Sequence, residues 1–186
     1  MFKANIVQDF ISKENREYLI NTAVASDLWA SGGSEFWDNR VINYHSLGKY
    51  DRNAAAIMLD VNIRCGQRIK ELFNLKEIYS DTLQVIRWFP GMEQPPHADD
   101  MSNTDIVGFN HRAFGSIVYL NDNYSGGHTY YPNFDFEVIP KAGALAIHPG
   151  DPEHLHGVTK IQDGMRYTIA SFWTQDKEKS YAWPIY

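Results

Sequence analysis

The sequence predicts a single α+β domain in which N-terminal helices support a β-rich core. Helical periodicity is confined to about residues 10–75, and from residue 82 short β-rich runs alternate with turns at a spacing of about 8–12 residues. The chain has 186 residues and is 44% hydrophobic and 14% aromatic, which is enough for one sizeable core. We therefore expect one domain over residues 1–186, with helical support at about 10–75 and a β-core at about 82–175. The strand pattern fits a sandwich or a jelly roll and does not separate the two.

Two helices are expected before the β-rich part. Residues 12–25 carry apolar side chains at helical spacing behind Ser12, which is a good N-cap. Residues 53–73 carry one apolar stripe that includes Ile57, Val61 and Ile69. Cys65 lies on this stripe and is expected to be a small buried apolar residue.

The β-rich part is divided by glycine, proline and asparagine turns. One further strand is expected before the second helix, and the sequence between the helices is otherwise read as loop. The predicted strands span residues 40–44, 82–89, 116–120, 128–131, 134–139, 142–148 and 166–173.

Composition limits the function and the location. The net charge of −6 gives no general attraction to a phosphate backbone, so nucleic acid is disfavoured as a partner. Cys65 is the only cysteine, which fits a reducing, cytoplasmic setting. The first residues have no apolar h-region, so no secretory signal is expected, and no apolar run is long enough for a membrane span.

The segment QPPHADD at 94–100 is the strongest candidate for a functional site. His97 and Asp99 are two positions apart, so on extended backbone both side chains face the same way. A second imidazole, His156, follows in LHGV at 155–158. Two histidines and one carboxylate form the set that holds non-haem Fe(II) in oxygenases, although zinc hydrolases use similar ligands. Taken alone, the His97–Asp99 pair also fits an ordinary turn at a strand end.

Arg166 favours the functional interpretation. It lies ten positions after His156, in GMRYT at 164–168, on a strand that ends in aromatic residues. A guanidinium grips a carboxylate at two points, and Thr168 would add a hydroxyl on the same face. The alternative is an arginine in a structural ion pair.

The region from about residue 83 to residue 173 resembles the 2-oxoglutarate and Fe(II)-dependent dioxygenases, and most closely the prolyl 4-hydroxylase-like branch. The resemblance rests on the order and spacing of several segments: HAD at 97–99, YLND at 119–122, GGHT at 126–129, GAL at 143–145, HGV at 156–158 and GMRY at 164–167. It implies a double-stranded β-helix, a cupin-like distorted jelly roll, with supporting N-terminal helices.

The resemblance also implies roles for single residues. His97, Asp99 and His156 would hold Fe(II), and Arg166 would bind the distal carboxylate of 2-oxoglutarate. Collagen-type prolyl hydroxylases usually carry lysine at that position, so arginine weakens a collagen-like assignment.

Three further positions match residues that surround the co-substrate in this family. Tyr119 and Thr168 match positions that often help to hold 2-oxoglutarate. Trp88 stands where many relatives have a tyrosine, and its indole has one donor and no acceptor. Dioxygen is the second co-substrate, and ascorbate is kept open as an additional reductant.

One ligand and the substrate remain open in the sequence. His154 lies two positions before His156 and could face the same side of a strand, but the spacing to Arg166 favours His156. Residues 36–50 and 101–114 are expected to select the substrate, and Trp37, Tyr44 and Tyr50 either line a groove or belong to the core.

Several functions fit this site. A peptidyl hydroxylase of the prolyl type is the leading hypothesis, and a hydroxylase of a free amino acid or other small molecule is the alternative. A non-enzymatic alternative is a cupin-like binding protein that keeps the fold without catalysis. The sequence does not indicate the oligomeric state.

Overall fold

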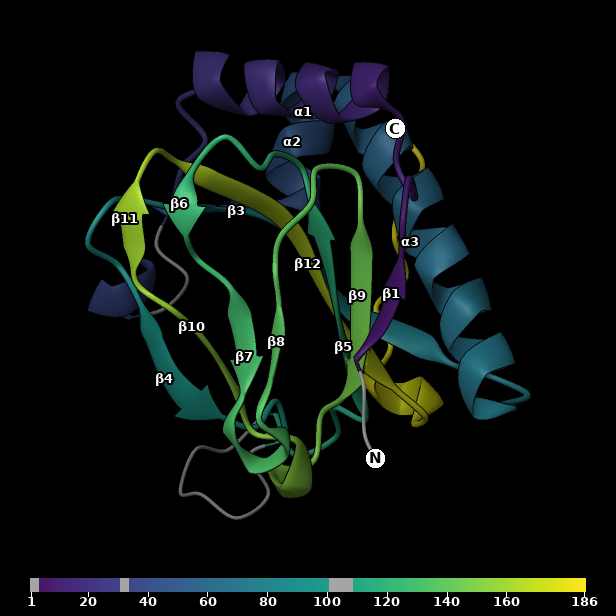
Figure 1. Ribbon diagram of the computed structural model, residues 1–186. Coiled ribbons are helices and arrows are strands. Elements are labelled where there is room, and N and C mark those ends of the chain that lie inside the picture. The colour runs from purple at the N-terminus through teal and green to yellow at the C-terminus, as the bar shows by residue number, and fades with distance from the viewer. Residues whose placement is uncertain (1–3, 31–33, 101–108) are drawn as a thin grey trace.

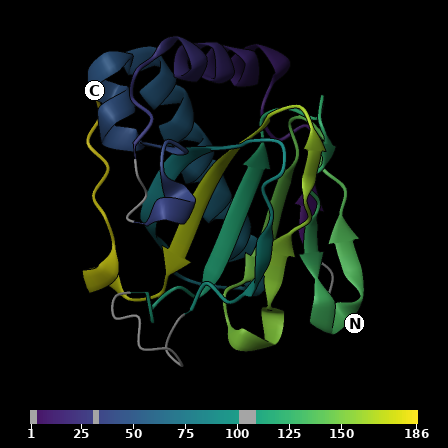
Figure 2. The same cartoon turned by 90° about the vertical axis from the view of Figure 1, so that its left-hand side faces the viewer.

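Two β-sheets face each other, and the helices cover the outer side of the larger one (Figures 1 and 2). The structure is a computed structural model that describes residues 4–30, 34–100 and 109–186. Within that part of the chain all strand pairs are antiparallel. Two facing antiparallel sheets with this strand order form a double-stranded β-helix, which confirms the predicted fold and decides between the sandwich and the jelly roll.

The larger sheet contains the long strands. Its six strands lie in the order β1 (Asn5–Val7), β9 (Leu145–Pro149), β5 (Phe114–Tyr119), β12 (Arg166–Thr174), β3 (Tyr79–Trp88) and β2 (Val41–Asn43).

The smaller sheet lies opposite and consists of short strands. Its order is β4 (Gln94–His97), β10 (His156–Val158), β7 (Thr129–Tyr131) and β8 (Phe136–Val138). A two-stranded ribbon joins β11 (Ile161–Asp163) to β6 (Ser125–Gly126). Short 3-10 turns occupy Glu35–Trp37 (η1), Pro132–Phe134 (η2), Pro152–His154 (η3) and Lys177–Lys179 (η4).

Both predicted helices are confirmed. Helix α1 spans Lys13–Ala25, and the Ser12 hydroxyl accepts a hydrogen bond from the Asn15 amide. Helix α3 spans Arg52–Phe73, is capped by Asp51, and ends at Asn74 in the left-handed conformation. Its buried stripe includes Cys65, whose thiol pKa is raised by burial to about 12, as expected of a packed, unreactive cysteine.

The interpretation of residues 36–50 as strand and loop is wrong in its second half. Strand β2 ends at Asn43, and a third helix, α2, follows at Tyr44–Tyr50. The Asn43 side chain caps it, and Tyr44 is buried with its hydroxyl donating to the Pro184 carbonyl at 2.6 Å. A helix of seven residues that contains Gly48 is weak by local propensity, so packing against α3 and the C-terminal residues decides its conformation.

Strand β3 presents one face to the helices and the other face to the space between the two sheets. Leu83 and Val85 belong to the main apolar cluster with the helices, whereas Ile86 and Trp88 line a cavity between the sheets. Because side chains alternate along a strand, β3 contributes both to the core under the helices and to the cavity wall.

No helix of the described residues is long and apolar enough to cross a bilayer.

Candidate active site

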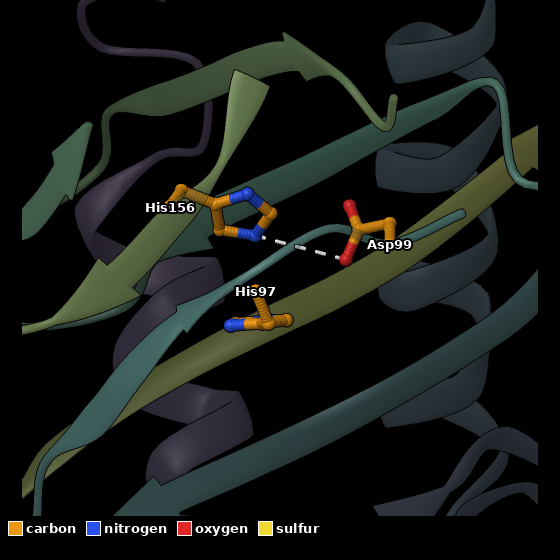
Figure 3. A group of neighbouring side chains, drawn as sticks. All are labelled: His97, Asp99 and His156. Atoms are coloured by element: carbon orange, nitrogen blue, oxygen red, sulfur yellow. Dashed lines mark ion pairs between the residues drawn. The ribbon is translucent and has the colours of Figure 1, made fainter. Parts of the chain in front are cut away.

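Three potential metal ligands come together where β4 and β10 pair. His97 ends β4, His156 begins β10, and the two lie opposite each other with ring centroids 4.5 Å apart. Asp99 follows β4, and its Oδ1 atom lies 3.6 Å from His156 Nε2 (Figure 3). One ligand atom from each residue lies within 4.8 Å of the other two. A pairing register thus joins residues that are far apart in the sequence.

The chemistry of this cluster fits a divalent metal. Asp99 is only 3% exposed, and its Oδ2 atom is buried without a hydrogen-bond partner among the described residues. A buried carboxylate oxygen in that state is costly unless a cation satisfies it. Two nitrogen donors and one carboxylate leave several coordination positions free, as in non-haem Fe(II) sites.

The histidines are held in the tautomer that suits a metal. His97 Nδ1 lies 3.1 Å from the Pro95 carbonyl, and His156 Nδ1 lies 3.2 Å from the His154 carbonyl. Donation from Nδ1–H to these carbonyls leaves Nε2 as the free base in each ring. Burial lowers the pKa of His156 to about 3, so this imidazole is neutral at ordinary pH, which is the form that binds a metal.

Gly115 and His148 form the wall behind Asp99. A Cβ atom on Gly115 would lie 2.5 Å from Asp99 Oδ2 and 2.6 Å from His148 Cε1, so only glycine fits on this part of β5. His148 is fully buried on β9, and burial lowers its pKa to about 4. Its ring centroid is 4.1 Å from that of His156, and it lines the cavity.

His154 points to a different partner. It lies in η3 and not on a strand, so the alternative in which it shares a strand face with His156 does not hold. Its Nδ1 lies 2.8 Å from Asp151 Oδ1, and its ring stacks on Phe134 with a centroid distance of 5.1 Å. The structure brings His156 and not His154 to the cluster.

Arg166 is a buried cation without a buried anion. It is 1% exposed, and no carboxylate of the described residues lies within ion-pair distance of it. Its guanidinium carbon lies 5.3 Å from the ring centroids of both Trp88 and Tyr119. Among the described residues its Nε atom has no hydrogen-bond partner, its Nη2 atom lies 3.5 Å from Thr129 Oγ1, and the Tyr124 hydroxyl is a further close neighbour. An unpaired buried guanidinium has donors to spare for an anion.

Polar groups surround the guanidinium. Thr129 and Tyr119 share a hydrogen bond of 2.8 Å between their hydroxyls, and Thr168 is buried two positions after Arg166. Thr168 and Thr129 line the cavity, whereas Tyr119 reaches it through Thr129. Thr129 was not singled out from the sequence, although it ends the GGHT segment on which the resemblance partly rests.

The metal cluster and the arginine share one cavity. His97, Asp99, His156, Arg166 and Trp88 all line it, together with both threonines. The Trp88 indole N–H is buried without a partner among the described residues, so it is a further donor for a bound molecule. A cavity with a metal site at one part and a buried guanidinium at another can hold a small acid that also binds the metal.

The sequence matches a known family over its β-core. Residues 83–174 match the 2OG-Fe(II) oxygenase superfamily. The chain belongs to this superfamily. It is 26% identical to a protein of Acanthamoeba polyphaga mimivirus named for prolyl 4-hydroxylase, over 87% of this chain and 73% of that protein. It is also 29% identical to an Arabidopsis thaliana protein named for prolyl 4-hydroxylase 3, over 74% of this chain and 49% of that protein.

Solved structures share the fold of this 2OG-Fe(II) oxygenase. The viral collagen prolyl hydroxylase of Paramecium Bursaria Chlorella virus-1, in complex with 2OG, superimposes with a TM-score of 0.67 at 18% identity, over 93% of this chain and 96% of that chain. A Trichoplax adhaerens prolyl hydroxylase, in complex with a hypoxia inducible factor oxygen degradation domain peptide fragment, superimposes with a TM-score of 0.64 at 18% identity. The match covers 94% of this chain and 84% of that chain. The protein is a dioxygenase that uses Fe(II), 2-oxoglutarate and O2.

Proposed function

We propose that this oxygenase hydroxylates prolyl residues of a peptide. His97, Asp99 and His156 hold the iron, and Arg166 holds the distal carboxylate of 2-oxoglutarate. One observation supports this most strongly: a cluster with ligand atoms within 4.8 Å of one another shares a cavity with a buried guanidinium that has no carboxylate partner in the described part of the chain. The names of the relatives supply the substrate class.

The residues divide the work between chemistry and placement. Bound Fe(II), with 2-oxoglutarate and O2, supplies the oxidation that places a hydroxyl on a C–H bond and gives succinate and CO2. Arg166 fixes one end of the diacid, so that its other end is directed to the metal. Thr129, Thr168 and the Trp88 indole N–H are among the polar groups that line this cavity. The cavity walls of Ile86 and Val158 keep water from this cavity.

A second cavity, of about 320 Å³, opens beside the metal cluster. It shares His97 and Asp99 with the first cavity and has Trp37 and Phe172 among its walls. Flat rings suit the apolar ring of a proline. The polar side chains of Thr82, Gln84 and Gln94 also line this cavity and can bond to a peptide backbone.

Arg112 also lines this second cavity. Its Nε donates to Asp81 at 3.1 Å, and its guanidinium carbon lies 3.7 Å from the Phe172 ring centroid and 4.1 Å from that of Phe109. A guanidinium that is already paired and stacked is a rigid wall more than a free anchor. Phe109 and Arg112 belong to the predicted substrate segment 101–114, of which residues 101–108 lie outside the described residues.

The predicted groove aromatics have separate outcomes. Trp37 lines both cavities. Tyr44 lines neither of these two cavities, because it is buried with its ring against those of Trp183 and Tyr186 in the C-terminal segment. Tyr50 is 53% exposed at the end of α2 and also lies outside both cavities. Of the two alternatives left open by the sequence, groove lining fits Trp37, core packing fits Tyr44, and neither fits the exposed Tyr50.

The substrate is tested by a panel. We expect succinate formation with Fe(II) and 2-oxoglutarate to rise at least about tenfold when a proline-containing peptide is added, since substrate contacts in the second cavity complete the site. The peptide should gain one oxygen at proline in its mass spectrum. Free proline and peptides with alanine in place of proline are the controls. Equal stimulation by free amino acids would instead support the small-molecule alternative, and no turnover with any substrate would support a binding protein.

Gly115 offers a test of the metal site that leaves all three ligands in place. Gly115→Ala introduces a methyl group at 2.5 Å from Asp99 Oδ2, so Asp99 or His148 must move. We expect a loss of stability of about 1–3 kcal/mol and weaker Mn(II) binding in titration calorimetry. Gly66→Ala on α3 is the matched control, because its methyl group would lie 2.9 Å from the Trp173 ring on β12 and would overpack there, away from the metal ligands. Both variants should have a lower melting temperature, but only Gly115→Ala should bind Mn(II) more weakly. Unchanged Mn(II) affinity in Gly115→Ala would contradict the assignment of Asp99 as a metal ligand.

The cytoplasmic location and the use of ascorbate stay predictions. A reducing setting is supported by the single cysteine, Cys65, which is buried and free. A single catalytic domain over residues 1–186 is proposed on the ground that α3 packs on strands of the β-core.

A further inference from the structure

A second buried guanidinium lies close to the co-substrate pocket. Arg40 precedes β2 and is 0% exposed. Its guanidinium carbon lies 4.0 Å from the Trp88 ring centroid, 4.4 Å from that of Phe36 and 4.6 Å from that of Trp37. Arg40 thus sits in an aromatic cage, and two of its walls, Trp37 and Trp88, also line the active-site cavity.

The hydrogen bonds of Arg40 explain only part of its burial. Its Nη1 donates to the Phe36 carbonyl at 2.6 Å, and its Nε donates to the Arg87 carbonyl at 3.2 Å. Its Nη2 atom is buried without a partner, and no carboxylate of the described residues pairs with it. Two neutral carbonyls do not balance a whole buried charge.

Arg40 and Arg166 act on the same region. Trp88 lies within 5.3 Å of both guanidinium carbons, measured to its ring centroid. Burial, and to a smaller extent the positive charge of Arg166, together lower the pKa of Arg40 to about 10. Two like charges that are buried together repel each other, and this arrangement is unfavourable until an anion arrives.

We propose that Arg40 is a positioning residue for the co-substrate, and that its charge acts across Trp88 with that of Arg166 to favour a 2-oxo acid with a second carboxylate. The inference rests on the proposed function of Arg166. Arg40 does not line the cavity, so it acts on the acid through the field and through the placement of Trp88 and Trp37. A purely structural role, as a staple for the segment before β2, is the alternative.

The test compares two acids that differ only in the distal carboxylate. Dissociation constants of 2-oxoglutarate and of 2-oxopentanoate are measured by calorimetry on Mn(II)-loaded protein under nitrogen, so no turnover is needed. We expect Arg40→Met to raise the dissociation constant of 2-oxoglutarate roughly tenfold, which is about 1.4 kcal/mol. The dissociation constant of 2-oxopentanoate should change less than about twofold. Equal weakening of both acids, or of neither, would overturn the proposal.

Two further variants separate charge from folding. Arg40→Lys keeps the charge without the planar fork, so we expect a lower melting temperature with the preference for the diacid retained. Folded Arg40→Lys protein that has lost this preference would contradict the proposal, even if Arg40→Met fails to fold. Arg87→Met is the matched control, since the Arg87 guanidinium stacks on Trp29 at 4.0 Å and bonds to Asn39, away from the cavity. It should leave the preference unchanged.

The outcome for the unaltered protein tests the underlying site. Tighter binding of 2-oxoglutarate than of 2-oxopentanoate supports Arg166 as the anchor. No difference between the acids in the unaltered protein would overturn the co-substrate site and the role of Arg40 together. A difference between the two acids that is as large in Arg40→Met as in the unaltered protein would overturn the role of Arg40 alone.

Discussion

Replacing His156 by alanine is expected to abolish succinate formation from 2-oxoglutarate, whereas replacing His154 by alanine is expected to preserve it. His156 supplies one of the three ligand atoms of the cluster, and its Nε2 faces Asp99 at 3.6 Å. Loss of an outer partner of a metal ligand costs about 10- to 100-fold in affinity, and loss of the ligand itself should cost more. Mn(II) binding by calorimetry and succinate by mass spectrometry are the measurements.

His154→Ala is a matched control because it keeps the part of His154 that the site uses. His156 Nδ1 donates to the backbone carbonyl of His154, which alanine retains. The change removes only the bond to Asp151 and the stacking on Phe134, so a small loss of melting temperature is the expected cost. Loss of Mn(II) binding in His154→Ala with normal binding in His156→Ala would reassign the ligand.

The helices and long strands could be predicted because their side-chain periods are long enough to read. Helix α3 shows six turns of one apolar stripe, and β3 and β12 alternate between the helix side and the cavity side. Helix α2 could not be predicted, because its seven residues follow a β-rich run and include Gly48. A Cβ on Gly48 would collide with the Tyr186 ring, so a contact with the far end of the chain accounts for this glycine.

The candidate site, too, could be predicted only in part. His97 and Asp99 could be paired from their spacing, but only the pairing of β4 with β10 places His156 opposite them. Strands of three or four residues carry no readable period, so that pairing is not visible in the residues alone. Arg40 had no local signal at all, since its importance arises from Trp88, which lies far along the chain.

Replacing Arg166 by methionine is expected to weaken 2-oxoglutarate binding to the Mn(II)-loaded protein roughly 100-fold, or about 3 kcal/mol, because the distal carboxylate loses the one arginine or lysine that lines the cavity among the described residues. Mn(II) binding itself should stay within about threefold, since Arg166 is not a metal ligand. Arg166→Lys keeps the charge and loses the two-point grip, so an intermediate loss of roughly tenfold is expected.

The melting temperature of the same variant separates binding from folding. Arg166 has no carboxylate partner among the described residues, and its Nε is buried and unbonded. A buried cation in this state costs stability, so a flexible apolar side chain of similar length should leave the ligand-free protein at least as stable. Arg166→Met would therefore bind 2-oxoglutarate more weakly, while its melting temperature without ligand stays the same or rises. A marked fall in melting temperature, with 2-oxoglutarate binding unchanged, would show that Arg166 serves the fold and that the anion is held elsewhere.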